Sequence, residues 1–448
     1  MTSDTMIELC IERPAVGGRM IARLDGRIVL VAGAIPGERI LAAVERSRGG
    51  AVLARTIEIL DGSRDRRPVV GAPECGGRSF AHITYRRQLE LKSEIVRDAF
   101  RRIGRIHLSA SLRVIPSPET GYRMRARLHV GDGRLGFFEE GSHRVCDVVG
   151  TGQLRPETER LVGLLGAHVG ALISTGARTV ELAEDLAGDQ CVLHVVVQEG
   201  EHVKLVTTHD ALRPLASIDG VTGLTVASGT DPRTRVVLAG TPYVSDPLTA
   251  FLGVSDSGAV GAPAGRHPAG SGTASLRRHA ASFFQSNRYL VPALVEAVAR
   301  LTERHEVVDL YAGVGLFAVS IAGRRGGPVT AVERDPSSAG DLVLNAAPLA
   351  SAVRVVRASV ETFLTRSAGL EGTAVIVDPP RVGLSRDVVS RLVRRRPERI
   401  VYVSCDVATQ ARDLRAFVES GYQIDQVQAF DMFPNTAHIE TVVSLDRT

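Results

Sequence analysis

Five short apolar segments in the second half of the chain constrain its fold more than any other feature. They read EVVDLY (306–311), PVTAVE (328–333), VRVVRA (353–358), AVIVDPP (374–380) and RIVYVSC (399–405), and stretches with a helical pattern separate them. Alternation of apolar strands with helices is typical of a parallel sheet that carries helices on both faces. We therefore expect an α/β domain with a doubly wound, Rossmann-like sheet. Ligands bind such sheets outside the carboxyl ends of the strands.

The ends of the first two strands indicate a nucleoside pocket. Gly313 and Gly315 follow the first strand in DLYAGVG, and they allow a tight turn and a close approach of the backbone to a ligand. Glu333 ends the second strand, 18 residues after Gly315. An acidic residue at this offset can accept both hydroxyls of a ribose. A surface glutamate at a strand end is the alternative, but the pairing with DLYAGVG favours the nucleoside.

The later strand ends offer groups for catalysis. Pro379 cannot donate to the ladder, so the fourth strand stops and presents Asp378 and Arg381 over the sheet edge. Cys405 ends the fifth strand beside the expected pocket and is a candidate nucleophile, because a thiolate is the strongest nucleophile among side chains near neutral pH. Glu440 lies in an apolar run, where burial would raise the pKa of its carboxyl. By itself, Glu440 is better explained as a charge on an edge strand.

The segment SFFQSN (282–287) places polar groups among aromatic rings. Gln285 and Asn287 could fix the orientation of a ligand. Alternatively, the segment is a hydrophobic staple before a helix that starts near Pro292.

The first 63 residues read as short strands joined by turns. The strongest turn signal is Asp25-Gly26, between two apolar runs, and Pro36-Gly37 is the next. This spacing fits a small closed β-barrel of the oligonucleotide-binding (OB) type.

Between the barrel and the α/β domain, residues 64–275 mix strand-like and helical runs. A helix is expected over about 85–103, and the whole region is predicted to be an α+β domain. Residues 253–274 consist mainly of Gly, Ala, Ser and Pro, which predicts a flexible loop. The α/β domain is then expected to occupy 276–448.

Cysteine usage and the N-terminus indicate a cytoplasmic protein. The five cysteines are odd in number and widely spread, which argues against a disulfide scaffold and for a reducing compartment. Cys10 and Cys191 are expected to be small core residues. The chain begins without the basic and apolar segments of a secretory signal. No apolar run approaches the about 18 residues of a membrane span, so we expect no membrane contact.

Basic residues are concentrated in one part of the chain. The whole chain has a net charge of +4, yet residues 61–130 hold 15 Lys or Arg against 7 Asp or Glu. A local basic stretch in a nearly neutral protein is typical of a nucleic-acid contact, although a solvated arginine-rich face explains it equally well. Only Lys92 and Lys204 are lysines among the 54 basic residues.

Several motifs occur in an order known from one enzyme family. They are SFFQSN, DLYAGVG, AVE, DPPR-x-G-L, YVSC-x-x-x-T and DMFPNT-x-H-x-E, and they cover most of 282–440. Together they resemble the RNA uracil-C5 methyltransferases, which make 5-methyluridine in transfer and ribosomal RNA. The similarity extends upstream to ECGGRSFAHITYRRQLELK (74–92) and GYRMRARLHV (121–130). The first 63 residues resemble a TRAM domain, a small RNA-binding barrel.

The resemblance implies methyl transfer from S-adenosylmethionine to C5 of a uridine in RNA. Cys405 matches the nucleophile, which adds to C6 of the uracil, and Glu440 matches the general base, which removes the C5 proton. The expected cofactor-binding residues are Gln285, Tyr311, Gly313, Glu333 and Asp378.

The resemblance also implies a division of labour and a substrate. Residues 1–63 would be a TRAM-like RNA-binding barrel, 64–275 a central RNA-binding domain and 276–448 the methyltransferase domain, in a monomer whose partner is RNA. The TRAM-like barrel favours 23S ribosomal RNA over transfer RNA, because the simplest transfer-RNA members lack it. Two alternatives are an RNA cytosine-C5 methyltransferase and a non-catalytic RNA-binding protein with a vestigial methyltransferase domain. The DMFPNT-x-H-x-E motif argues against the first, and the intact Cys405 and Glu440 argue against the second.

One departure from the family concerns an iron–sulfur cluster. Many members hold such a cluster through four cysteines that include C-G-G-C, but here the motif ends in Arg78, and Cys146 is displaced from the fourth position. A four-iron cluster normally requires four thiolates, so we expect no cluster and no metal site. Arg66, Arg67 and Arg78 are instead expected to face RNA phosphates.

Overall fold

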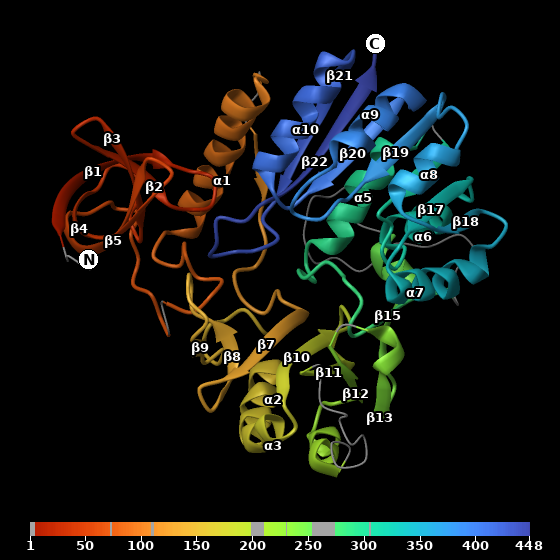
Figure 1. The fold of residues 1–448 in the computed structure, drawn as a ribbon, viewed down its shortest axis with the longest axis horizontal. Coiled ribbons are helices and arrows are strands. Elements are labelled where there is room, and N and C mark those ends of the chain that lie inside the picture. The colour runs from red at the N-terminus through yellow and green to blue at the C-terminus, as the bar shows by residue number, and fades with distance from the viewer. Residues whose placement is uncertain are drawn as a thin grey trace.

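The computed structural model describes residues 5–71, 74–108, 112–198, 210–229, 231–252, 274–303 and 306–448, and four sheets with the helices around them make up this part of the chain. Figure 1 shows the N-terminal barrel at one end, with the eight-stranded sheet across the molecule from it and the seven-stranded sheet below both. The loop predicted over 253–274 lies outside the described residues apart from Ala274. Within these ranges, no helix has the length and the apolar character needed to cross a membrane.

The N-terminal strands close into a five-stranded barrel, as the sequence predicts. Its order is β1-β2-β3-β5-β4, and the strands are β1 Met6–Pro14, β2 Met20–Leu24, β3 Arg27–Ala32, β4 Arg39–Arg48 and β5 Ala51–Asp61. Asp25 and Gly26 join β2 to β3 with φ of 48° and 77°, the left-handed conformation that a tight hairpin requires. Leu9, Ile11 and Val29 are buried inside the barrel.

The central region contains a mixed seven-stranded sheet of order β13-β12-β11-β10-β7-β8-β9. Its strands are β7 Arg125–Gly131, β8 Arg134–Phe138, β9 Val145–Cys146, β10 Ala177–Glu184, β11 Cys191–Val197, β12 Gly223–Ser228 and β13 Val236–Gly240. Helices α2 (Pro156–Gly166) and α3 (Val169–Ser174) bury Leu165 and Leu172 in the same cluster as Val180 and Leu193 of the sheet. The strands β14 (Tyr243–Pro247) and β15 (Ser275–His279) form a separate antiparallel ribbon.

The C-terminal region contains the predicted doubly wound sheet, of order β18-β17-β16-β19-β20-β22-β21-β6. The first five strands are parallel, and β22 runs antiparallel to both of its neighbours. The strands are β6 Val114–Ile115, β16 Glu306–Leu310, β17 Val329–Glu333, β18 Val353–Arg357, β19 Thr373–Val377, β20 Arg399–Ser404, β21 Tyr422–Phe430 and β22 Glu440–Arg447. The expected fold class is therefore confirmed for this sheet.

Helices cover both faces of this sheet. One face packs against α5 (Val291–Leu301), α6 (Leu316–Arg325) and α7 (Pro336–Ala346), and the other against α8 (Val360–Arg366), α9 (Arg386–Arg395) and α10 (Val407–Glu419). Alternate residues of each strand serve the two cores: Val307 and Val401 face the first group, while Val308 and Ile400 face the second. The short helices are η2 Arg213–Ser217, η3 Pro232–Thr234, η4 Leu248–Phe251 and η5 Ala347–Leu349.

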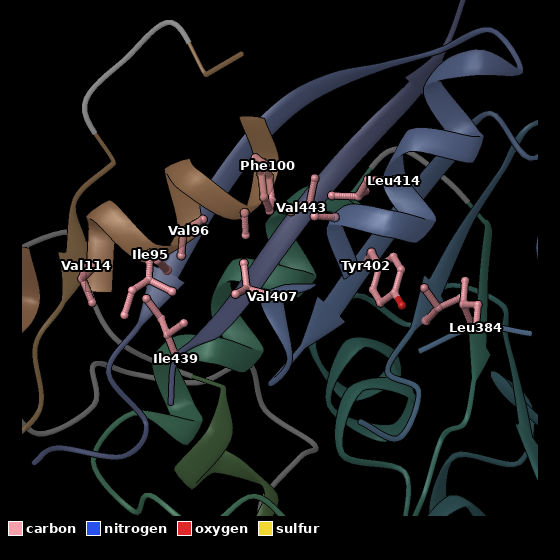
Figure 2. Packing of buried hydrophobic residues seen from close by; sticks show 14 of the residues in the cluster. Ile95, Val96, Phe100, Val114, Leu384, Tyr402, Val407, Leu414, Ile439 and Val443 are labelled. Atoms are coloured by element: carbon pink, nitrogen blue, oxygen red, sulfur yellow. The ribbon is translucent and has the colours of Figure 1, made fainter. Parts of the chain in front are cut away.

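A helix from the first quarter of the chain completes the second of these layers. The helix predicted over about 85–103 is α1 (Tyr85–Ala99), which continues as the π-helical turn η1 (Phe100–Gly104). Ile95, Val96 and Phe100 are buried in one cluster with Val443 and Leu414 of β22 and α10, and Figure 2 shows these side chains close together. The helix α1 lies between the barrel and the eight-stranded sheet (Figure 1).

The segment that joins the barrel to α1 corrects two sequence-based expectations. Cys75 and Cys146 form a disulfide with their Cα atoms 5.7 Å apart, although the cysteine count gave no indication of a bridge. Arg78 is buried and donates to the carbonyls of Thr151, at 2.7 Å, and Val70, so it does not face RNA.

Arg66 and Arg67 are also committed to partners within the protein. Arg66 makes an ion pair with the buried Glu38, and Arg67 makes one with Glu119. The expectation that these arginines face RNA phosphate is wrong, because carboxylates and carbonyls distant in sequence already take their guanidinium groups.

The residues of this segment do not fit an iron–sulfur cluster. The disulfide consumes the thiol of Cys75, and the buried guanidinium of Arg78 brings positive charge to the same segment. Among the described residues, no group of three or more His, Cys, Asp or Glu side chains could hold a metal ion.

The absence of a cluster stays a prediction with a direct test. Protein purified anaerobically should contain negligible iron and show no sulfur-to-iron charge-transfer absorption near ~400 nm, because four thiolates are not available. Stoichiometric iron in that preparation would contradict this prediction.

Candidate active site

The carboxyl ends of the central parallel strands surround a cavity of about 650 Å³. The cavity lies where β16 separates β17 from β19, the point at which the chain order of the strands reverses. All of the site residues that the sequence analysis proposed line it: Gln285, Tyr311, Gly313, Glu333, Asp378, Cys405 and Glu440. Asn287, also considered there, is instead fully buried and donates to Ser117 Oγ and to the carbonyl of Met432.

Glu333 is held rigidly at the end of β17. Its Oε2 accepts the backbone N–H of Gly313 at 2.9 Å, and its Oε1 accepts those of Arg334 and Asp335, each at 2.6 Å. These bonds lock the carboxylate against the turn that follows β16. Oε1 thereby accepts two bonds, whereas Oε2 accepts one and keeps a lone pair that can accept a ligand hydroxyl.

The turn after β16 gives a ligand access to the backbone. Tyr311 and Gly313 have φ of 63° and 56°, and a Cβ on Gly313 would meet no protein atom within 4 Å. Gly315 has a different role, because a Cβ there would lie 2.7 Å from Leu342 and 2.8 Å from Val319. Gly313 therefore leaves room for a ligand, while Gly315 permits close packing of α6.

A second hollow of about 630 Å³ adjoins the first. The two share Tyr311, Glu333, Asp335 and Pro380, and the second also contains Ser359. A nucleoside held by Glu333 can thus extend in two directions, with its base in one hollow and its other substituent in the hollow that contains Cys405.

Asp378 lines the cavity that also contains Cys405 and Glu440. Gln285 Nε2 donates to its carboxylate at 3.3 Å. Burial raises the pKa of Asp378 to about 7, and the bond from Gln285 opposes that shift. Asp378 therefore titrates near neutral pH and can donate or accept a hydrogen bond.

Strand pairing brings Cys405 and Glu440 together. Ser404 of β20 and Thr441 of β22 are partners in the antiparallel ladder. Cys405 follows Ser404, and Glu440 precedes Thr441, so Cys405 and Glu440 lie at the same level. Adjacent strands are about 4.8 Å apart, so the two residues are neighbours at the cavity wall. Both side chains line the cavity.

Burial disfavours the ionised forms of both side chains, and one arginine opposes this effect. Burial raises the pKa of the Cys405 thiol to about 11, and the Glu440 carboxylate adds to the shift. Burial and the charge of Asp378 raise the pKa of Glu440 well above its ordinary value. Arg381 counteracts both shifts by its charge and also hydrogen-bonds the thiol. The sequence analysis placed Arg381 at this edge through the DPPR motif but gave it no role.

The seven-stranded sheet supplies the opposite wall of the cavity. Arg125 and Arg127 of β7 line it and share the carboxylate of Glu181, at 2.9 Å and 2.7 Å. Phe283, which is 62% exposed, also lines the cavity. The alternating arginines of GYRMRARLHV (121–130) indicated such a basic surface but not its position at the cavity.

Comparisons with known proteins agree with this geometry. The family model described as tRNA (Uracil-5-)-methyltransferase matches residues 271–448. The chain is 31% identical to the 23S rRNA (uracil(1939)-C(5))-methyltransferase RlmD of Halomonas elongata, over 99% of this chain and 90% of that protein. It is 30% identical to an uncharacterized RNA methyltransferase of Thermotoga maritima, over 97% and 98% of the two chains.

A solved structure gives the same result for the whole chain. The tRNA (uracil-54, C5)-methyltransferase of Pyrococcus abyssi, in complex with S-adenosyl-L-homocysteine, superposes with a TM-score of 0.70 at 25% identity, covering 98% of this chain and 99% of that one. The fold and the cavity therefore define an α/β methyltransferase that uses S-adenosylmethionine. The chain belongs to the RNA (uracil-5-)-methyltransferase family.

The thiol chemistry of the free enzyme gives a pH-dependent prediction. Alkylation of Cys405 by iodoacetamide should accelerate about tenfold per pH unit from about pH 7 to about pH 9, because the thiolate is the reactive form and its pKa lies above this range. The measurement is the rate of modification of the peptide that carries Cys405, followed by mass spectrometry. Arg381→Gln should slow the reaction at each pH. A rate independent of pH would show that the thiolate is already formed.

Proposed function

We propose that this enzyme transfers a methyl group from S-adenosylmethionine to C5 of a uridine in RNA through a covalent bond between Cys405 and C6 of the uracil. The observation that carries the proposal is the placement of Cys405 and Glu440 side by side at the wall of a cavity that Glu333 and Tyr311 also line. The proposed nucleophile Cys405, the proposed base Glu440 and Glu333, which would bind a ribose, therefore line the same cavity.

The chemistry requires a nucleophile because C5 of uracil is only weakly reactive. S-adenosylmethionine supplies an electrophilic methyl group when it is bound. The Cys405 thiolate forms a bond to C6, and the electron pair of the C5–C6 double bond makes C5 a nucleophile that takes the methyl group. Glu440, as a carboxylate, then removes the C5 proton, the double bond re-forms and the sulfur–C6 bond breaks. Arg381 favours the ionised form of both groups.

The five expected cofactor residues divide the binding of S-adenosylmethionine between the two hollows. Glu333 would accept hydrogen bonds from the ribose hydroxyls. Tyr311 and Gly313 would lie beside Glu333, where the cofactor comes close to the backbone of the turn. Gln285 and Asp378 would face the amino-acid part of the cofactor, on the side of Cys405. The hydrogen bonds that already fix Glu333 and Asp378 support this division, since a pre-ordered site loses little entropy on binding.

The target uridine must leave its base stack, because C6 is inaccessible within a helix. We propose that residues 1–63 act as a TRAM-like RNA-binding barrel, 64–275 as a central RNA-binding domain and 276–448 as the methyltransferase domain. Arg127 of β7 lines the cavity wall and is 59% exposed although it pairs with Glu181, which supports a role of the central region in holding the RNA backbone.

We favour 23S ribosomal RNA over transfer RNA as the substrate of a monomeric, cytoplasmic enzyme. The similarity to the ribosomal enzyme of Halomonas elongata over nearly the whole chain supports this choice. The similarity to the transfer-RNA enzyme of Pyrococcus abyssi supports the other substrate.

Two variants test the covalent step. Cys405→Ala should abolish methyl transfer without loss of S-adenosylmethionine binding, since no other group can add to C6. Glu440→Gln should form the methylated adduct but fail to release it, because the C5 proton has no acceptor. A denaturing gel should therefore show an RNA–protein complex for Glu440→Gln and none for Cys405→Ala. Normal turnover by Cys405→Ala would exclude the mechanism.

Nucleoside mass spectrometry identifies the RNA. A strain that lacks the gene should lose 5-methyluridine from 23S ribosomal RNA and keep it in transfer RNA. The wild-type gene should restore the nucleoside, and the Cys405→Ala gene should not. Loss from transfer RNA alone would assign the enzyme to that substrate instead.

A further inference from the structure

The loop that carries the proposed base is held by a helix from another part of the chain. Residues 431–439 connect Phe430, the end of β21, to Glu440, the start of β22. Phe433 in this loop lines the cavity beside Cys405 and Glu440. The conformation of the loop therefore determines where the catalytic carboxylate and the adjoining wall lie.

Lys92 of α1 is bonded to this loop at two points. Its ammonium makes an ion pair with Asp431, and Nζ donates to the carbonyl of Phe433 at 3.0 Å. Both charged side chains are 0% exposed. A buried ion pair costs desolvation free energy that its mutual attraction barely offsets, so stability alone is a weak reason for its presence.

The identity of the residue at position 92 is also informative. Lys92 is one of two lysines among 54 basic residues, in a chain that uses arginine almost everywhere else. An ammonium is compact and directs three donors around one atom, whereas a guanidinium is a larger planar fork. At position 92 the compact ammonium reaches a carboxylate and a backbone carbonyl through one nitrogen atom.

Gln88, one turn earlier on α1, holds the loop at Asn435. Its Oε1 accepts the N–H of Asn435 and its Nε2 donates to Asn435 Oδ1, each at 2.9 Å. Asn435 has a φ of 63°, a left-handed conformation that needs such support in a residue other than glycine. Arg67 Nη2 donates to the same Oδ1 at 2.7 Å.

We propose that Lys92, assisted by Gln88, is a positioning residue for catalysis, which holds the 431–439 loop so that Glu440 can reach the C5 proton. This inference rests on the proposed function and adds a role for a helix that lies outside the matched methyltransferase region, 271–448. Lys92 acts through Asp431 and the Phe433 carbonyl and does not touch the substrate. Release of the adduct, which needs Glu440, is the step that depends on it.

The test compares three variants with the wild-type enzyme. Lys92→Met leaves the Asp431 carboxylate buried and unpaired, so it can fail to fold. The double variant Lys92→Met/Asp431→Leu removes both charges and keeps the volume apolar, which restores folding without restoring the bond to Phe433. Ser93→Ala is the matched control, because Ser93 is the next residue of α1 and donates to the carbonyl of Leu112, away from the loop.

The expected signature is slow release rather than weak binding. The double variant should retain its melting temperature and its affinity for S-adenosylmethionine, while kcat falls by about 10- to 100-fold, the effect of a displacement of about 1 Å in a catalytic group. The KM for RNA should fall together with kcat, because the slow step follows covalent attachment, and the covalent RNA–protein complex should accumulate on denaturing gels, as for Glu440→Gln. Ser93→Ala should behave as wild type in each measurement.

Three results would overturn the inference. They are wild-type turnover by the folded double variant, a fall in kcat without accumulation of the adduct, and a loss of activity that only follows the loss of folded protein. The proposed function fails separately: if Glu440→Gln traps no adduct, the covalent mechanism is wrong whatever Lys92 does. If Glu440→Gln traps the adduct and the double variant does not, only the role of Lys92 is excluded.

Discussion

The antiparallel pairing of β20 with β22 is the constraint on which the catalytic arrangement depends. Cys405 and Glu440 are 35 residues apart in sequence, and the ladder that pairs Ser404 with Thr441 places them side by side. A slip of one residue in this register would turn every side chain of β22 to the opposite face of the sheet. The hydroxyl of Thr441 in β22 donates to the carbonyl of Ser404 and to Gln410 Oε1, and these buried bonds fix the register.

The sequence predicted this half of the molecule well because its information is local. Each parallel strand is a short apolar run, and each functional residue follows the run directly, so strand ends such as Glu333 and Cys405 locate the cavity. Burial on both faces explains why the runs are continuously apolar. The topology of the central sheet could not be predicted in this way, because pairings such as the parallel one of β11 with β12 depend on segments that leave no local pattern.

The errors have a related cause. A count of charges indicated a basic face around Arg66, Arg67 and Arg78, but their partners are Glu38, Glu119 and backbone carbonyls from other segments. A count of cysteines likewise gave no sign of the bridge between Cys75 and Cys146, which lie 71 residues apart. Composition records which groups are present, whereas tertiary contacts decide which of them remain free to meet a ligand.

The position of α1 has a consequence for how the protein is made. This helix is synthesised long before Val443 of β22, with which Phe100 and Ile95 share one core cluster. Contacts between such distant segments form late, and the apolar side of α1 must remain uncovered until β22 has been synthesised. The methyltransferase layer is therefore not an autonomous C-terminal unit. A fragment that began at residue 271 would expose the surface of β22 and α10 that α1 covers, so the catalytic layer needs both ends of the chain to fold.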